Sequence, residues 1–354
     1  MKRAFAFFGL AAGALALSLA ATRDASAIPP PFINDAAILG EMQLDGEVRV
    51  MPRTLREYGF FLDAAGRYPD LRLIPYELNT PLWSDGADKL RYIYVPEGKM
   101  IEASGEGLLR FPVGTAIIKT FAFGEGEDQR YIETRVLMHR ADGWIALPYR
   151  WNAEQTEATL ALAGGRIDLT TPQGEAISYR IPNKNQCKTC HSLDGAVVPI
   201  GPKARNMSPA VLGRLESAGK LAGVPEVDHP MPQWGDDTAP TAALARAYLD
   251  ANCAHCHQPG GGASNSGLDL RWEQQDPFAI GVNKHPVAAG RGAGGMLVSI
   301  EPGNPDASII VHRMDSNEPG VAMPELGRSS VDHKAVALIR RWIAEMAPAA
   351  GRPD

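Results

Sequence analysis

The sequence predicts an α+β protein with two domains, an antiparallel β-rich domain first and an all-α domain after it. Short runs of β-branched and aromatic residues, separated by glycine-containing turns, fill the first half of the chain, a pattern typical of antiparallel strands. Segments with helical periodicity fill the second half. We place the boundaries at 1–27 for a leader, 28–223 for the β-rich domain, 224–240 for a proline-rich linker and 241–349 for the helical domain.

The N-terminus has the pattern of a secretory signal peptide. Lys2 and Arg3 precede an apolar, alanine-rich run at 4–21, and Ala25-Ser26-Ala27 offers a cleavage site between small residues. We therefore expect export to the periplasm, cleavage before Ile28 and no stable membrane insertion of the mature chain. An uncleaved membrane anchor is the alternative.

The secondary structure elements follow in order along the mature chain. We expect strands at 90–95, 115–123, 131–138, 144–147, 159–162 and 177–181. We expect helices at 210–218, 241–252 and 332–346, the first of them introduced by Ser208 as N-cap and Pro209 in the first turn. The last strand ends shortly before Cys187, so the β-rich domain carries the first cysteine motif at its C-terminal end.

All four cysteines lie in two copies of one motif, Cys187-Lys-Thr-Cys190-His191 and Cys253-Ala-His-Cys256-His257. C-x-x-C-H is the attachment motif of c-type haem. Two thiols add to the two vinyl groups of one porphyrin, and the histidine that follows ligates the iron. The sequence therefore predicts two covalently attached haem c groups, with His191 and His257 as the proximal iron ligands.

Two other uses of the cysteines are open. A structural zinc site would bring both C-x-x-C knuckles together, but the 62 residues from 191 to 252 exceed the usual spacing and the two histidines would be coincidence. Two disulfides would each close a tight C-x-x-C loop and would not require His191 or His257.

The C-terminal part of the chain, from about 238 to 349, resembles a class I cytochrome c module. A helix runs into Cys253, the segment 302–308 precedes Met323-Pro324, and an amphipathic helix containing Trp342 ends the module. The resemblance implies that Met323 is the distal ligand of the iron on His257. Met314 and Met296 are the competing methionines.

The mature chain as a whole resembles a family of bacterial dihaem c-type cytochromes. The resemblance covers nearly all of it and is carried by the segments 76–84, 111–115, 132–135, 185–191 and 199–205. It implies two haems and gives no substrate.

The distal ligand of the first haem is not specified by a motif. Only 49 residues separate Cys190 from Pro240, too few for a complete class I fold, so the β-rich domain must contribute to the pocket. Met207 is the first candidate by position. Met138, His139 and His229 follow it.

Lys119 is a further candidate near the first haem. Strict alternation in the strand at 115–123 puts Ile117, Lys119 and Phe121 on one face, and a buried lysine needs a reason. A cross-strand pair with Glu133 is one explanation. The other is that residues 70–191 distantly resemble cytochrome P460 and β-type cytochrome c-prime, which implies a haem packed against a sheet with an open distal face.

Charge and motifs limit the function. The net charge of −6 becomes −8 when residues 1–27 are removed, which argues against nucleic acid and favours a redox partner protein with a basic docking surface, or serves only solubility. The chain has no phosphate loop, nucleophile elbow, H-E-x-x-H or dinucleotide fingerprint. We expect a periplasmic electron-transfer protein; a dihaem peroxidase or oxidase and a gas-binding sensor with an open first haem are the alternatives.

Overall fold

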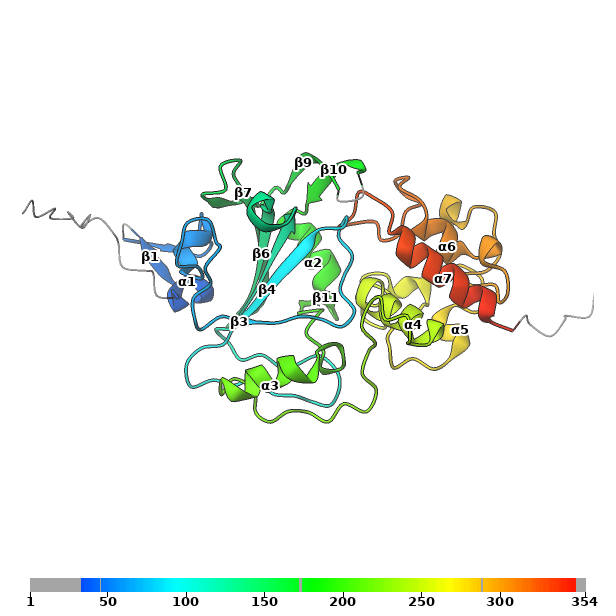
Figure 1. Cartoon of the computed structure of the whole chain (residues 1–354), viewed down its shortest axis with the longest axis horizontal. Helices are drawn as coiled ribbons and strands as arrows, with labels where there is room; N and C mark the ends of the chain where they lie inside the picture. The colour runs from blue at the N-terminus through cyan, green and yellow to red at the C-terminus, as the bar shows by residue number, and fades with distance from the viewer. Residues whose placement is uncertain (1–32, 45, 172–173, 288, 348–354) are drawn as a thin grey trace, which may run out of the picture. The chain divides into compact units, whose positions relative to one another are not determined.

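An antiparallel six-stranded sheet forms the centre of the β-rich part of the chain (Figure 1). The computed structural model describes residues 33–44, 46–171, 174–287 and 289–347, so the predicted leader at 1–27 lies outside the described residues. The strands follow one another in sequence order across the sheet: β3 (Ile74–Pro75), β4 (Asp88–Tyr94), β5 (Ala116–Phe123), β6 (Arg130–Arg140), β7 (Gly143–Trp151) and β8 (Ala158–Leu160).

Each face of this sheet carries its own hydrophobic cluster because side chains alternate along the strands. On one face Ile118 and Val136 pack with Tyr58 and Phe60 from the segment before the sheet. On the other face the apolar members come from the central strands and from a helix, and they include Ile117, Leu137, Ala146, Val211, Leu212 and Leu215. The predicted alternation of the strand at 115–123 is therefore confirmed.

Three two-stranded sheets complete the β structure of the described residues. They pair β1 (Met42–Leu44) with β2 (Glu47–Arg49), β9 (Gly165–Thr170) with β10 (Ala176–Ile181), and β11 (Ser192–Leu193) with β12 (Ala196–Val197). The β9–β10 hairpin buries Tyr179 and Ile177 against Phe121 and Phe123 at the end of β5. This contact extends the hydrophobic core past the C-terminal end of β5.

Helices dominate the chain after residue 240. The helices are α1 (Asp35–Leu39), α2 (Lys184–His191), α3 (Pro209–Ser217), α4 (Thr241–Asn252), α5 (Pro277–Ile280), α6 (Ile309–Met314) and α7 (His333–Glu345). The three predicted helices correspond to α3, α4 and α7, whereas α2, which carries the first cysteine motif, was not predicted. In α7 the apolar residues Val336, Ile339, Trp342 and Ile343 are buried in one cluster with Leu244 and Leu249 of α4. The chain is therefore α+β, as predicted.

The proline-rich segment 224–240 contains no helix or strand but is fastened to the β-rich part. Met231 donates its backbone N–H to Arg205 O (2.8 Å), and Trp234 donates to Asn79 O (2.8 Å). The Asn79 amide in turn donates to Met231 O (3.0 Å). Among the described residues no helix has the length and apolar character needed to cross a membrane.

Candidate cofactor sites

The first C-x-x-C-H motif forms the end of helix α2. Asn183 and Gln186 make a reciprocal capping box, in which each side chain accepts a hydrogen bond from the other residue's backbone N–H (2.8 and 2.9 Å). The cap fixes where the helix begins, so Cys187 and Cys190, three residues apart, share one helix face. Cys187 is buried in the cluster beneath the sheet, and His191 is the last residue of the helix.

The hydrogen bond of His191 fixes its tautomer. Its Nδ1 lies 2.7 Å from Val198 O, and a backbone carbonyl can only accept, so Nδ1 carries the hydrogen and Nε2 keeps a free lone pair. Burial lowers the pKa of His191 to about 3, which keeps the ring neutral. A neutral imidazole held by an acceptor at its other nitrogen is the usual arrangement of a metal-binding histidine.

The tautomer of His257 is also fixed by a hydrogen bond at Nδ1, but the acceptor is a side chain. Its Nδ1 lies 2.9 Å from Ser266 Oγ. The Ser266 hydroxyl donates to Ala263 O (2.7 Å), so its only hydrogen is used there and its lone pairs accept from His257. Burial lowers the pKa of His257 to about 4. Both histidines are thus neutral and present Nε2 to a ligand.

Each histidine lines a cavity together with cysteines of its own motif. The cavity at His191 has a volume of about 150 Å³ and is also lined by Cys187, Cys190 and residues of β4, β5 and β6. The cavity at His257 has about 460 Å³ and is lined by Cys253 and Cys256, within the range of about 300–1,000 Å³ of ligand and cofactor pockets. The first cavity is smaller than this range.

Two methionines reach both cavities. Met323 and Met314 line the cavity at His257 and also that at His191. Met323 is held by its backbone N–H, which donates to Arg313 O (2.9 Å), whereas Met314 is buried in the helical core. Met296 lines neither cavity in the described part of the chain. The structure therefore brings Met323 and its competitor Met314 to the second site and leaves Met296 away from it.

The sequence-based candidates for the first distal ligand lie elsewhere. Met207 is buried among the apolar side chains around α3, and Met138 is buried on the opposite face of the sheet. His139 stacks on Trp144 and bonds to Phe111 O (2.8 Å), and His229 is exposed. Over the residues that the structure describes, none of these four candidates lines the cavity at His191.

Lys119 does line the cavity at His191, but its surroundings differ from those expected. Glu133 accepts two hydrogen bonds from Arg135 (2.9 and 2.6 Å) and one from Tyr179 (2.7 Å). No ion pair joins Glu133 to Lys119 among the described residues, so the cross-strand pair proposed for Lys119 is wrong. Burial, then Arg135 and Arg91, hold the pKa of Lys119 well below its usual range.

The two motifs lie next to each other, which their separation in sequence did not predict. Leu193 and Gly261 form a β-bridge, and Asp194 N donates to Gly260 O (3.0 Å). Gly260 has a φ of +75°, which favours glycine, and a Cβ at this position would also displace the Asp194 carboxylate. Cys190 and Cys256, the second cysteine of each motif, line the same cavity at His257.

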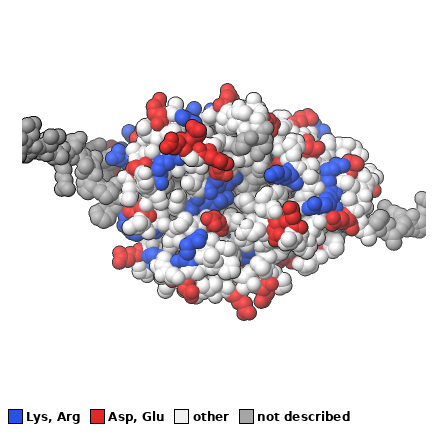
Figure 2. Space-filling model, in the orientation of Figure 1, with Lys and Arg blue, Asp and Glu red and all other residues white. Residues whose placement is uncertain are grey.

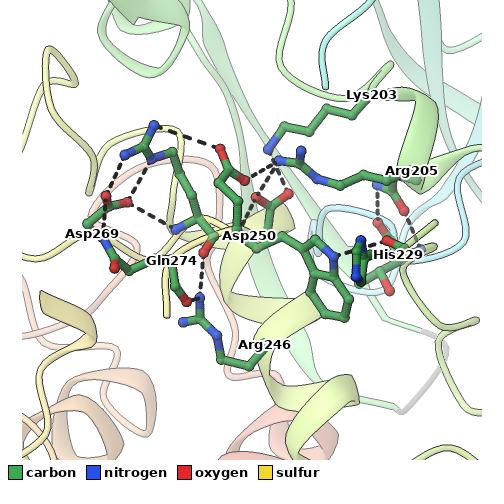
Figure 3. A network of polar contacts seen from close by, with 12 residues as sticks. Lys203, Arg205, His229, Arg246, Asp250, Asp269 and Gln274 are labelled. Carbon is green, nitrogen blue, oxygen red and sulfur yellow. Dashed lines mark hydrogen bonds and ion pairs between the residues drawn. The ribbon is translucent and has the colours of Figure 1, made fainter. Parts of the chain in front are cut away.

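A polar network joins α4, the helix that precedes the second motif, to the segment after the first motif (Figure 3). Asp250 on α4 is buried and accepts from Lys203 Nζ (2.6 Å), Arg205 Nη2 (3.4 Å) and Trp272 N (3.0 Å). Burial raises the pKa of Asp250, but Lys203 and Arg205 outweigh it and the net pKa is lowered. Arg205 also pairs with Glu273 (2.7 Å).

Two further contacts join the same parts of the chain. Asn252, the last residue of α4, accepts from Trp83 N (2.7 Å). Asp85 accepts from the backbone N–H groups of Ser329 (2.7 Å) and Ser330 (2.8 Å), just after the loop that carries Met323. These bonds fix the positions of α4 and of the methionine loop against the β-rich part.

The donor groups fit two covalently bound haems. Each site offers two free thiols and a neutral imidazole, and Met323 supplies a thioether at the second cavity. Within the described residues no group of three or more His, Cys, Asp or Glu side chains is arranged to hold a metal ion by itself. The chain matches no family model, no curated protein and no solved structure in comparisons with known proteins.

Proposed function

We propose that this protein is a dihaem c-type cytochrome that transfers electrons between redox partners in the periplasm. One observation carries the proposal: each C-x-x-C-H motif presents a histidine whose Nδ1 is already bonded, beside a cavity lined by cysteines of the same motif. Zinc knuckles and C-x-x-C disulfides require neither histidine. The resemblance of the sequence to dihaem cytochromes and of its C-terminal part to class I cytochrome c supports the same function.

The residues have separable roles in this proposal. Haem iron, when bound, supplies a one-electron ferric/ferrous couple. Cys187, Cys190, Cys253 and Cys256 anchor the two groups covalently, and Val198 O and Ser266 Oγ orient the imidazoles of His191 and His257. Met323 would supply a thioether ligand at the second site, which would raise the potential.

The adjacency of the motifs supports transfer between the two sites. Cys190 and Cys256 line the same cavity at His257, and the Leu193–Gly261 bridge and the Asp250 ion pairs hold the two parts together. The acidic net charge suits a partner with a basic docking surface and does not suit nucleic acid. The periplasmic location follows from the predicted leader at 1–27.

Intact mass of the exported protein tests the cofactor content. After acid–acetone extraction, which removes non-covalent haem, we expect a mass with two haem additions. Replacing Cys187 and Cys190 together by alanine should leave one addition, and so should replacing Cys253 and Cys256. A wild-type mass equal to that of the bare polypeptide would contradict the proposal.

A second function is favoured by the first site. In the described structure Met207, Met138, His139 and His229 do not line the cavity at His191, which leaves this site with Lys119 and with His255, Met314 and Met323, which it shares with the second site. A first haem with an open face would bind diatomic gases or turn over a peroxide. Carbon monoxide added to the reduced protein should then change the Soret band of about half the haem, whereas two strongly ligated haems would give no change.

A further inference from the structure

Three cationic side chains form a row across the sheet beside His191. Arg91 on β4 lies directly opposite Lys119 on β5, and Lys119 lies directly opposite Arg135 on β6. All three side chains line the cavity that His191 lines. Like charges directly opposite each other on neighbouring strands are destabilising, so a compensating charge would stabilise a row of three basic side chains.

The described residues supply only part of that charge. Among the described residues Glu133 forms an ion pair with Arg135 and with no other member of the row. Arg91 donates to a backbone oxygen, Lys89 O (3.2 Å), and Lys89 itself is a fourth basic side chain nearby. For Lys119 neither an ion pair nor a hydrogen bond occurs among the described residues.

Phe121 weakens the repulsion among these basic side chains but does not neutralise their charge. Arg135, Lys119 and Lys89 lie 4.2, 5.1 and 6.0 Å from the centroid of its ring. The negative face of an aromatic ring attracts cations, but it carries no net charge. Figure 2 shows basic side chains gathered near the middle of this face of the molecule, over the part of the sheet where β4 lies in Figure 1.

An unbonded donor lines the same cavity. Trp83 Nε1 is buried and has no hydrogen-bond partner within the described structure. An indole N–H can only donate, and a buried donor without an acceptor is costly. Trp83 comes from the loop before β4 and is independent of the cationic row, yet it calls for the same kind of partner, an acceptor.

We propose that Arg91, Lys119, Arg135 and Trp83 form a binding site for a small oxyanion or a carboxylate in the cavity at His191. Two sources offer this chemistry, a free anion such as formate or nitrite and a propionate of the first haem. The second source rests on the proposed function, and the first does not. A bound anion accepts from guanidinium, ammonium and indole donors, which removes the repulsion along the row.

Thermal unfolding of the protein as purified, with formate or nitrite at constant ionic strength, tests the free-anion source. We expect the unfolding temperature to rise in a saturable way. Lys119→Met should weaken the apparent affinity at least tenfold because it removes the central charge. Lys99→Met, at an exposed lysine remote from the cavity, should leave it unchanged. If Lys119→Met does not fold, Trp83→Phe removes the indole donor and keeps a ring, and a smaller weakening is expected.

Resonance Raman spectroscopy tests the propionate source. If a propionate already fills the site, free anions will have no saturable effect, and Lys119→Met will shift the propionate-bending band while Lys99→Met does not. The absence of both the anion effect and the band shift would overturn the proposal. A mass without haem together with saturable formate binding would overturn the proposed function and leave the anion site standing.

Discussion

The two C-x-x-C-H sites use the same five-residue pattern in different surroundings. The first lies against a sheet, where cationic residues of β4, β5 and β6 form one wall of a cavity of about 150 Å³. The second lies among helices and loops, in a cavity of about 460 Å³ that Met323 lines. The motif supplies two thiols and a histidine at each site, and the surrounding fold decides which other side chains reach the cavity and what charge they bring.

The comparison predicts that Met323 serves the second site. Met323→Ala should abolish a methionine–iron charge-transfer band in the oxidised spectrum and lower the potential of the haem on Cys253 and Cys256, because a thioether stabilises ferrous iron. Absorption spectroscopy and a redox titration measure both. The matched variant is Met314→Ala, and loss of the band in that variant alone would assign the ligand to Met314.

The next expected effect concerns the ion pairs of Asp250, which join helix α4 to Lys203 and Arg205. Asp250→Ala leaves Lys203 and Arg205 without their buried partner, and removing one side of such a cluster costs about 3–5 kcal/mol of unfolding free energy. Chemical denaturation measures the loss. The control is Asp306→Ala, at an exposed pair with Arg340, for which we expect about 0–1 kcal/mol. Equal losses in the two variants would contradict a structural role for the buried cluster.

The pH dependence of stability should distinguish the cationic region from the rest. Burial, then Arg91 and Arg135, lower the pKa of Lys89 from 10.5 to about 7. Above pH 7 the unfolded chain holds a proton that the folded chain has lost, so stability rises with pH from 7 towards 10.5. This group adds about 1.4 kcal/mol per pH unit.

Denaturation at pH 7, 8 and 9 measures this slope. Lys89→Met should reduce it by about 1.4 kcal/mol per pH unit, and Lys99→Met should leave it unchanged. A slope that is the same in all three proteins would show that Lys89 keeps its ordinary pKa in the folded chain.

The smallest expected effect separates the two histidines. Ser266→Ala removes the acceptor at His257 Nδ1, whereas the acceptor at His191 is a backbone carbonyl that no substitution removes. The imidazole of His257 then becomes a weaker electron donor, so the potential of the second haem should rise slightly and that of the first should not move. Loss of this bond should also cost about 1 kcal/mol of stability. Equal shifts of the two potentials would contradict the prediction that Ser266 affects the second haem alone.

Local patterns predicted much of the fold. Alternation identified the strands that became β5 and β6, and helical periodicity with the Cys253 boundary gave α4 its observed ends. One predicted strand ended at 147, whereas β7 continues to Trp151 because pairing with β6 outweighs local propensity. Helix α2 was missed although Asn183 and Gln186 form a capping box, a signal present in the sequence.

The site was predictable only where a motif defined it. The six motif residues follow from their spacing, but Arg91 and Arg135 join Lys119 only through the register of three strands, which one sequence does not specify. Trp83 and Ser266 likewise depend on loops whose course is set by tertiary contacts. Asp250 meets Lys203 across 47 positions of the chain, a separation at which no local pattern operates.

The bridge between Leu193 and Gly261 also imposes an order on assembly. The chain is made from its N-terminus, so the first motif exists for some time before the residues that cover it. Closing a contact between such distant positions costs more loop entropy than closing the local turns of the β-rich part. The first motif is therefore the more accessible of the two during biosynthesis. When the second motif folds against the first, the two motifs enclose each other.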